Sequence, residues 1–335
     1  MHQTLFHGRR AFRIENGQIR VTILAEGGHI AEILEKSTGV NPLWLPPWPS
    51  IEVSAWSAEK CPLYGNDSES KLLAGIMGQN LCLDIFGPPS EAEARAGIVA
   101  HGEAGVAPYD FEAVPEGLRC RCILPASQLA FERTVTLDGP RARIHETVEN
   151  LAPLDRPIAW TQHVTLGPPF LERGRTQFRA SATRSRAIGE TADFDWPYYG
   201  DRDLRIYPAE ASSAGYTAHL MDPGSPEAFF LAWSPTARVV TGYVWKREDF
   251  PWLGIWEENN SRAHTPWLGH TQTRGMEFGV SPFPEPRRKM IERGTLFGAP
   301  AYRWIPARAK LTAEYHAMVA PADALPETLN SLHSV

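Results

Sequence analysis

Three consecutive stretches near the middle of the chain alternate apolar and polar residues along their length. They cover residues 117–124, 129–137 and 142–150, and Asp138-Gly139-Pro140 separates the second from the third. An alternation with a period of two places the apolar side chains on one face of a β-strand, and Gly and Pro clusters mark the turns between strands. The pattern predicts an antiparallel meander.

The same combination of short strand-like runs and turns extends over most of the sequence. The 335 residues include 29 prolines and 27 glycines, which is typical of many short elements joined by turns. Asn16-Gly17 is a hairpin signal inside the first run. Further strands are expected at residues 12–24, 27–34, 216–221, 228–233, 238–245, 253–256 and 311–319.

Helical signals are few and short, at residues 54–60, 91–96 and 321–332. Strands do not alternate with long helices, which argues against a doubly wound fold. We therefore predict an all-β fold, a large antiparallel β-sandwich with few short helices. We expect a single domain over residues 1–335, because no linker stands out.

Charge and hydropathy exclude several classes of partner. The formal net charge is -6 and Lys and Arg are not clustered, so nucleic acid and anionic membranes are not expected as partners. The sequence contains no stretch of 18 apolar residues, so no transmembrane helix is predicted. The N-terminus lacks the apolar core of a signal peptide. We expect a cytoplasmic monomer or homodimer.

The four cysteines, Cys61, Cys82, Cys120 and Cys122, lack the spacing of a zinc site. Free buried thiols are therefore expected. Close histidine pairs, phosphate loops and nucleophile elbows are not recognised in the sequence. We predict no metal and no cofactor, although His101, His163 and Glu277 carry donor atoms that a metal can bind.

Two histidines and one glutamate are the candidate catalytic residues. His101 ends an apolar run just before Gly102, His163 ends a strand-like run, and Glu277 lies between two glycines. Each alone has an ordinary structural interpretation, as a core or surface histidine or a solvent-facing glutamate. Together, two imidazoles and a carboxylate with a pKa raised by burial supply a proton donor and acceptor. Sugar ring opening needs this pairing.

Four motifs, in this order, resemble the galactose mutarotase-like (aldose 1-epimerase) superfamily over about residues 10–320. They are Gly27-Gly-His-Ile, Gly97-Ile-Val-Ala-His-Gly102, the stretch from Thr147 to His163, and Arg274-Gly-Met-Glu277. The resemblance implies a β-sandwich and mutarotation without a cofactor. It implies that Glu277 is the base and His163 the acid, and that His101 hydrogen-bonds the ring oxygen or the C1 side of the sugar.

The sequence departs from the family pattern at several positions. Val164-Thr-Leu follows the second histidine in place of Pro-Tyr-Phe, and Gly279 replaces a glutamine. Asp201 and Asp203 are the candidates for the family's sugar-binding aspartate. These departures leave the sugar open.

Phe86-Gly-Pro-Pro89 resembles the branch that acts on hexose 6-phosphates, and Arg95 is the nearby arginine for a phosphate. The strand period places Thr161 and His163 on one face and Trp160 and Gln162 on the other. Glu257 and Glu258 are the rivals to Glu277 as base, and Trp252, Trp256 and Trp267 are candidates for a sugar platform. The expected substrate-binding residues are Arg95, Gln162, Trp160, Trp256, Glu257 and Arg274.

The functional prediction is therefore an isomerase that interconverts the α and β anomers of an aldose, with a small-molecule carbohydrate as its partner. A non-catalytic carbohydrate-binding protein on the same scaffold remains an alternative. A sugar-acid isomerase or lyase is the other alternative, and it would use a basic pocket that includes Arg173, Arg175 or Arg274.

Overall fold

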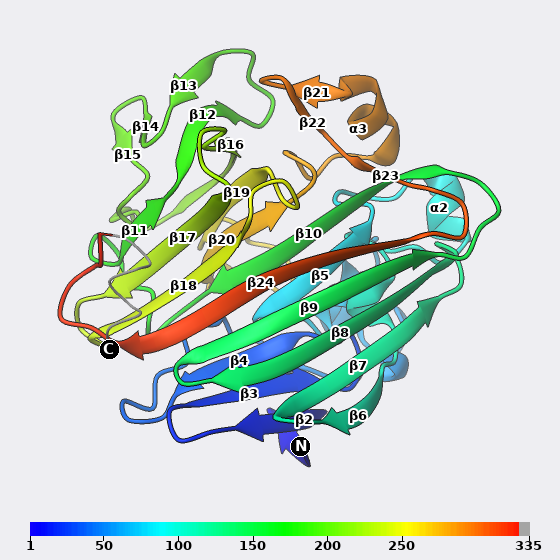
Figure 1. Cartoon of the computed structure of the whole chain (residues 1–335), viewed down its shortest axis with the longest axis horizontal. Helices are drawn as coiled ribbons and strands as arrows, with labels where there is room; N and C mark the ends of the chain where they lie inside the picture. The colour runs from blue at the N-terminus through cyan, green and yellow to red at the C-terminus, as the bar shows by residue number, and fades with distance from the viewer. Residues whose placement is uncertain (328–335) are drawn as a thin grey trace.

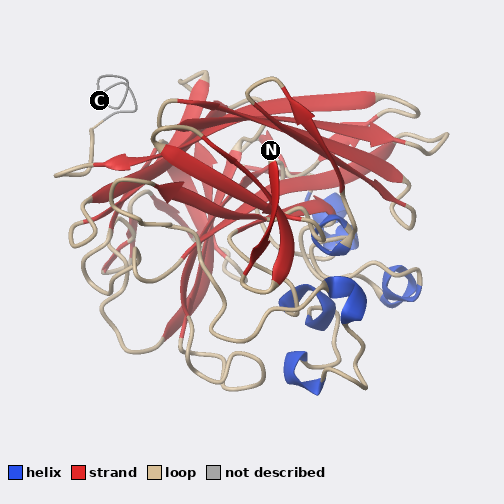
Figure 2. Cartoon of the chain, turned by 90° about the horizontal axis from the view of Figure 1, so that it is seen from below, coloured by secondary structure: helices blue, strands red, loops and turns tan. Residues whose placement is uncertain are grey.

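Two large antiparallel β-sheets lie face to face in the computed structural model, which describes residues 1–327 (Figure 1). The larger sheet has 12 strands and the smaller has 8. Short helices and long loops gather on one side of the molecule (Figure 2). The predicted all-β sandwich with few short helices is therefore confirmed.

The larger sheet contains both His163 and Glu277, two of the candidate catalytic residues. Its hydrogen-bonded order is β1-β2-β3-β4-β5-β10-β20-β19-β16-β12-β13, and β23 pairs with β10. The strands are β1 (His2–Phe6), β2 (Arg9–Glu15), β3 (Ile19–Leu24), β4 (Ile30–Glu35), β5 (Gln79–Asp84), β10 (Arg156–Leu166), β12 (Ala182–Ala187), β13 (Asp193–Asp195), β16 (Ser213–Met221), β19 (Trp252–Asn259), β20 (Gln272–Gly279) and β23 (Arg303–Ile305).

The smaller sheet contains the predicted meander, in the order β11-β17-β18-β24-β9-β8-β7-β6. Leu118 pairs with Val135, and Val135 with Ile144, so the apolar positions of the three alternating stretches align on one face. The strands are β6 (Asp110–Val114), β7 (Gly117–Leu124), β8 (Leu129–Asp138), β9 (Arg141–Asn150), β11 (Gln177–Ala180), β17 (Glu227–Ser234), β18 (Val239–Lys246) and β24 (Lys310–Pro321).

Two short ribbons complete the described strands, β14 (Tyr198–Tyr199) with β15 (Arg202–Asp203) and β21 (Thr295–Leu296) with β22 (Ala299–Pro300). The helices are η1 (Val53–Ala55), η2 (Pro62–Tyr64), α1 (Ser70–Leu73), α2 (Glu91–Arg95), η3 (Ala104–Val106) and α3 (Arg287–Arg293). In residues 1–327, none of the helices has the length and apolar character needed to cross a bilayer.

The helix predictions had mixed outcomes. The helix expected at 91–96 is α2, and Ser90 and Glu93 form a capping box at its start. The helix expected at 54–60 is wrong, because the backbone becomes extended at Trp56 after one 3₁₀ turn. The third helix was predicted at 321–332. Residue 321 ends β24 and residues 322–327 are not helical, while 328–332 lie outside the described residues.

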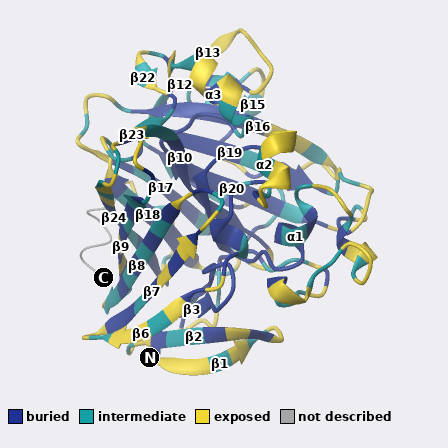
Figure 3. Ribbon diagram, turned by 90° about the vertical axis from the view of Figure 1, so that its right-hand side faces the viewer, coloured by how far each residue is buried: buried dark blue, intermediate teal, exposed yellow. Residues whose placement is uncertain are grey.

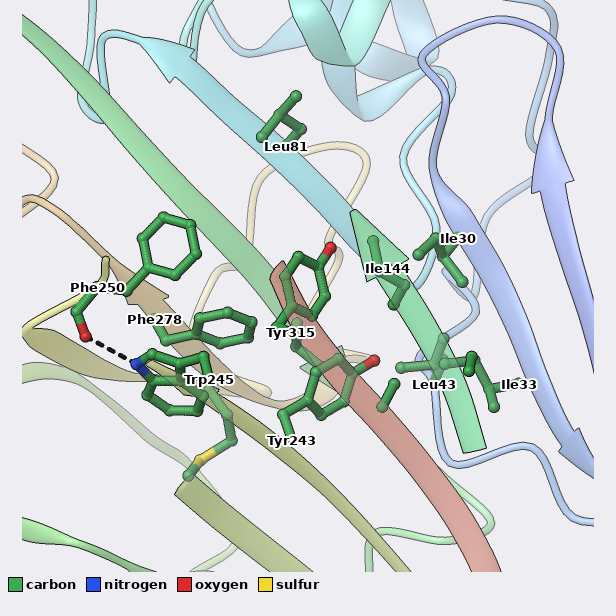
Figure 4. Packing of buried hydrophobic residues seen from close by; sticks show 14 of the residues in the cluster. Ile30, Ile33, Leu43, Leu81, Ile144, Tyr243, Trp245, Phe250, Phe278 and Tyr315 are labelled. Carbon is green, nitrogen blue, oxygen red and sulfur yellow. Dashed lines mark hydrogen bonds between the residues drawn. The ribbon is translucent and has the colours of Figure 1, made fainter. Parts of the chain in front are cut away.

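The main apolar core lies between the two sheets (Figure 4). Phe278 of the larger sheet stacks on Trp245 of the smaller sheet, with ring centroids 4.2 Å apart. The Trp245 indole donates a 2.7 Å hydrogen bond to the carbonyl of Phe250, so its one polar atom is satisfied. This packing fixes the larger sheet from one side and leaves its other face available to the loops.

A polar network is buried within this core. Arg133 and Glu146 form an ion pair 2.8 Å long, and both side chains are fully buried. The Glu146 carboxylate also accepts hydrogen bonds from Trp160, Gln162 and Tyr315. The charges are thus fully compensated, which a buried pair requires.

Arg133→Met is expected to destabilise the protein by about 3–5 kcal/mol, because it leaves the Glu146 charge buried without its cation. Urea unfolding at neutral pH measures the change. The matched control is Arg143→Met, which removes the exposed pair with Glu314. The two variants should differ clearly in unfolding midpoint, and equal midpoints would show that the buried charge is compensated by other groups.

Candidate active site

Neighbouring strands place His163 and Glu277 opposite each other. His163 of β10 pairs in register with Glu277 of β20, and Glu277 pairs with Gly254 of β19. The residues next to His163, Gln162 and Val164, face the smaller sheet. Because side chains alternate along a strand, His163 and Glu277 project from the opposite face of the sheet.

A tight turn brings His101 to the same face. His101 has a φ of 67° and is followed by Gly102, whose φ is 87°. A Cβ on Gly102 would lie 2.0 Å from the carbonyl oxygen of Leu83 in β5, so only glycine fits there. The His101 ring Nδ1 lies 2.7 Å from the carbonyl oxygen of Phe86, which can only accept. Nδ1 therefore donates, which leaves Nε2 free to face the cavity.

His101, His163 and Glu277 line one cavity of about 190 Å³. The centroids of the two imidazole rings are 5.4 Å apart. The cavity lies between the sheet and the loops around α1 and α2, which lie beside β19 and β20 in Figure 3. Most of its wall is apolar, and its large apolar side chains are Trp44, Leu72, Leu73, Ile76, Trp256 and Trp267.

The two groups expected to move protons are in direct contact. His163 Nε2 lies 3.0 Å from Glu277 Oε1, and His163 Nδ1 lies 3.0 Å from Thr165 Oγ1. The contact between the imidazole and the carboxyl group is close but outside hydrogen-bond alignment, so Glu277 Oε1 has no hydrogen-bond partner. A buried oxygen in this state is available to a ligand proton.

Burial sets the protonation states of these groups. It raises the pKa of the Glu277 carboxyl well above the usual range. Burial, reinforced by His101, lowers the pKa of His163 to about 3. Burial also lowers the pKa of His101, although the nearby Glu69 opposes this. The His163–Glu277 pair therefore holds one proton over a wide range of pH, and it titrates as a unit.

Glycines clear the sheet surface around Glu277. A Cβ on Gly275 would lie 2.5 Å from Glu277 Oε1, and one on Gly254 would lie 2.0 Å from the Tyr216 hydroxyl. A Cβ on Gly279 would lie 2.3 Å from Thr161 Oγ1. Gly275 thus leaves space for the Glu277 carboxyl group, and Gly279 leaves space for the Thr161 hydroxyl.

One ion pair lines the cavity. Arg262 Nη1 lies 3.2 Å from Glu69 Oε2, and the guanidinium lies 4.6 Å from the centre of the Trp267 ring. Arg262 is the one Lys or Arg among the described residues that line the cavity. Its charge is compensated by Glu69.

The structure brings Trp256 into the cavity and places Trp160 and Gln162 on the other face of the sheet. The Trp256 ring lies 5.6 Å from that of His163. Trp160 and Gln162 donate hydrogen bonds of 3.0 and 2.6 Å to Glu146 in the core. The period of two explains this, because both residues are an odd number of positions from His163.

Arg274 and Glu257 also lie outside the cavity. They pair with each other across β19 and β20, on the core side of the sheet. Arg274 Nη1 also donates to the carbonyl of Leu204 at 2.8 Å, so the donors of this guanidinium are used by groups of the protein itself. Arg95 lies on α2 with a side chain 74% exposed, next to Glu91.

Three further candidates, Asp203, Arg173 and Glu258, do not line the cavity and have partners of their own. Asp203 pairs with Arg205 at 2.8 Å, and Arg173 binds Asn259 at 3.0 Å. Glu258, a rival base, accepts hydrogen bonds from the backbone of Ser261 and Arg262. It therefore orders the loop that carries Arg262.

Several lining residues gave no usable signal in the sequence. Trp44, Glu69 and Arg262 belong to loops, where no periodicity predicts the direction of a side chain. Tyr216 was predicted only as a strand residue. Within residues 1–327, no group of three or more His, Cys, Asp and Glu side chains is arranged to hold a metal ion. Cys82, Cys120 and Cys122 are buried free thiols, and Cys61 is partly buried.

Solved structures identify the fold. A protein from Klebsiella pneumoniae whose name assigns it to the aldose 1-epimerases is similar with a TM-score of 0.68 and 13% identity, over 94% of this chain and 80% of that one. A galactose mutarotase-like protein from Clostridium acetobutylicum is similar with a TM-score of 0.66 and 12% identity, over 96% and 98%. A galactose mutarotase-like protein from Lactobacillus casei is similar with a TM-score of 0.62 and 14% identity, over 92% of this chain and 100% of that one.

The chain therefore has the galactose mutarotase-like fold. No protein-family model matches the sequence, and no curated protein is similar to it at a significant level. At these identities the likeness establishes the fold, and function is argued from the site.

Proposed function

We propose that this protein is an isomerase of the aldose 1-epimerase type, which interconverts the α and β anomers of an uncharged aldose. The observation that carries the proposal is the direct contact of His163 with Glu277 in a cavity that His101 also lines. This arrangement holds one transferable proton and one vacant proton acceptor side by side, as ring opening requires.

Ring opening begins with Glu277 as carboxylate and His163 as imidazolium. Glu277 removes the proton from the hydroxyl oxygen on C1, and a C1–O1 double bond forms. The bond between C1 and the ring oxygen breaks, and its electron pair goes to the ring oxygen, which takes the proton of His163. The pair ends as carboxylic acid and neutral imidazole, with no net change in protons.

Ring closure is the reverse, after rotation about the C1–C2 bond. The neutral pair that it needs is the form that the burial of both groups favours. Both directions therefore use the same one-proton state of the pair. His101 is neutral with Nε2 unprotonated, so it accepts a hydrogen bond from a hydroxyl group on the C1 side of the sugar.

The charge of the cavity favours an uncharged sugar. Recognition of a phosphate or a carboxylate calls for an arginine with free donors, often in a bidentate arrangement. Arg262 is paired with Glu69, and Arg274 and Arg95 lie elsewhere. This argues against a hexose 6-phosphate and against the sugar-acid isomerase or lyase.

Polarimetry on freshly dissolved single anomers tests the proposal. The panel contains uncharged aldoses, their 6-phosphates and the corresponding uronic acids. We expect acceleration that is proportional to protein concentration for at least one uncharged aldose, and weaker acceleration for its charged derivatives. The tryptophans of the wall suit the apolar face of a sugar ring in a binding protein too. Binding without acceleration would favour that alternative.

A further inference from the structure

The Tyr216 hydroxyl is a buried polar group without a hydrogen-bond partner. Tyr216 lies on β16, lines the cavity with Glu277, and is only 6% exposed. A buried hydroxyl that is left unpaired costs free energy, and buried tyrosines usually find a partner. The Tyr216 hydroxyl is therefore a donor that is free to bind a group that becomes charged in the cavity.

The sheet register directs this hydroxyl towards Glu277. Tyr216 pairs with Trp256 of β19, one row along the sheet from Gly254 and Glu277. Its hydroxyl reaches back over Gly254, since a Cβ there would lie 2.0 Å from the oxygen. Gly254 is the direct cross-strand neighbour of Glu277, so the hydroxyl lies over the position next to the carboxyl group.

Glu277 is a buried acceptor that lacks a hydrogen-bond donor. Its Oε1 is buried and accepts no hydrogen bond, and its position over Gly275 depends on the absence of a side chain there. One donor and one acceptor, both unpaired, thus lie in adjacent glycine gaps of the same sheet face. A protonated carboxyl has little need of the donor, whereas a carboxylate needs it strongly.

We propose that Tyr216 is a positioning residue, which donates its hydroxyl hydrogen bond to the Glu277 carboxylate when that group ionises for catalysis. The inference rests on the proposed function in one respect, the role of Glu277 as the base. The contact itself is a property of the protein alone and can be measured without a sugar.

The ionisable groups near Glu277 do not supply this donor, and the unpaired Thr161 hydroxyl lies over Gly279, away from Gly254 and Gly275. His163 of β10 lies at 3.0 Å but is misaligned, and Cys82 of β5 is a buried thiol, which is only a weak hydrogen-bond donor. His101 is bonded to Phe86 through Nδ1, and its pKa is lowered. The Glu69–Arg262 ion pair lines the cavity as a compensated pair.

Removal of the Tyr216 hydroxyl should change the pKa of Glu277, which distinguishes it from a variant that only disturbs the fold. Without the hydroxyl, the carboxylate is less stable, so the pKa of Glu277 rises further, by about one unit for the loss of one charge-assisted hydrogen bond. The carboxylate–imidazolium form is populated about tenfold less, so kcat should fall about tenfold near neutral pH. The high-pH limb of the activity profile should move upward, so activity persists to higher pH.

Infrared difference spectroscopy of the sugar-free protein tests the contact. The carbonyl band of protonated Glu277 is identified as the band that Glu277→Gln removes, and its loss is followed as pH rises. Tyr216→Phe should move the midpoint upward by about one unit. The matched control is Tyr207→Phe, because the Tyr207 hydroxyl is also buried and unpartnered but lies outside the cavity. It should leave the midpoint unchanged.

An unchanged midpoint in Tyr216→Phe would overturn the proposal. Gly254→Ala is a second variant, because its methyl group would occupy the space of the hydroxyl, and it should shift the midpoint in the same direction. If the wild-type protein accelerates no aldose, the proposed function fails, while the titration still decides whether Tyr216 supports the carboxylate.

Discussion

Glu277→Gln is expected to lower the rate of anomer interconversion about 10²–10⁴-fold, the usual contribution of a positioned acid or base. The amide keeps the shape of the side chain but cannot accept the proton of the C1 hydroxyl. It also removes the cost of burying an ionisable carboxyl, so the variant should fold at least as stably as the wild type at neutral pH. Polarimetry gives the rate, and circular dichroism checks the fold.

The matched control is Glu103→Gln, which changes a buried glutamate outside the cavity. Glu103 Oε2 accepts two hydrogen bonds from Ser127, which the amide oxygen of glutamine can still accept, and only the longer bond from the Ala126 N–H to Oε1 is lost. This variant should keep wild-type activity. Full activity in Glu277→Gln would remove Glu277 from the mechanism.

His163→Asn should cause a loss of similar size, because the imidazolium supplies the proton to the ring oxygen. The double variant with Glu277→Gln should be little worse than either single variant. Two groups that share one proton act as a unit, and their effects do not multiply. Multiplicative losses would show that the two residues act in separate steps.

Mild acid is expected to destabilise the protein steeply. Burial lowers the pKa of His29, His163 and His219 to about 3 in each case. These groups stay neutral in the folded state but take up protons on unfolding below about pH 6.5, the ordinary value for histidine. Stability is therefore complete above pH 6.5 and is lost as the pH falls from 6.5 towards 3.

The other groups of the site whose pKa is shifted change the number of protons taken up on unfolding only a little. His101 acts in the same direction, whereas Glu277, with its raised pKa, acts in the opposite direction above pH 4.5. Uptake of about three protons gives a slope of about 4 kcal/mol per pH unit between pH 5 and 6. Urea unfolding at several pH values measures it.

His219 allows this explanation to be tested away from the cavity. Its ring lies between the hydroxyls of Ser185 and Thr217, at 2.7 and 2.8 Å. His219→Asn should flatten the pH dependence by about one proton, even if it lowers stability at pH 7.5. A stability that hardly changes between pH 7.5 and 5 would contradict the assignment of neutral buried histidines.

The strand periodicity predicted the fold because apolar residues repeat at every second position over whole strands. Leu118, Val135 and Ile144 are such positions, and they align across the sheet as expected. The helix predicted at 54–60 is wrong because the segment has no side-chain cap and its backbone becomes extended at Trp56. Local pattern is thus sufficient only where it is long and regular.

The same periodicity accounts for the candidate site residues that the structure separates. Arg274 is three positions from Glu277, so a strand places the two side chains on opposite faces. Trp160 and Gln162 are separated from His163 in the same way. Glu69 and Arg262 reach the cavity from loops far apart in the sequence, and no local pattern predicts that meeting.

The most direct test of the central claim is exchange NMR on the two anomers of an uncharged aldose at neutral pH, with and without protein. The proposed mechanism predicts faster exchange in proportion to wild-type protein, and an acceleration about 10²–10⁴-fold smaller with Glu277→Gln. Uncharged aldoses that bind to the cavity and exchange at the spontaneous rate with the wild-type protein would contradict it.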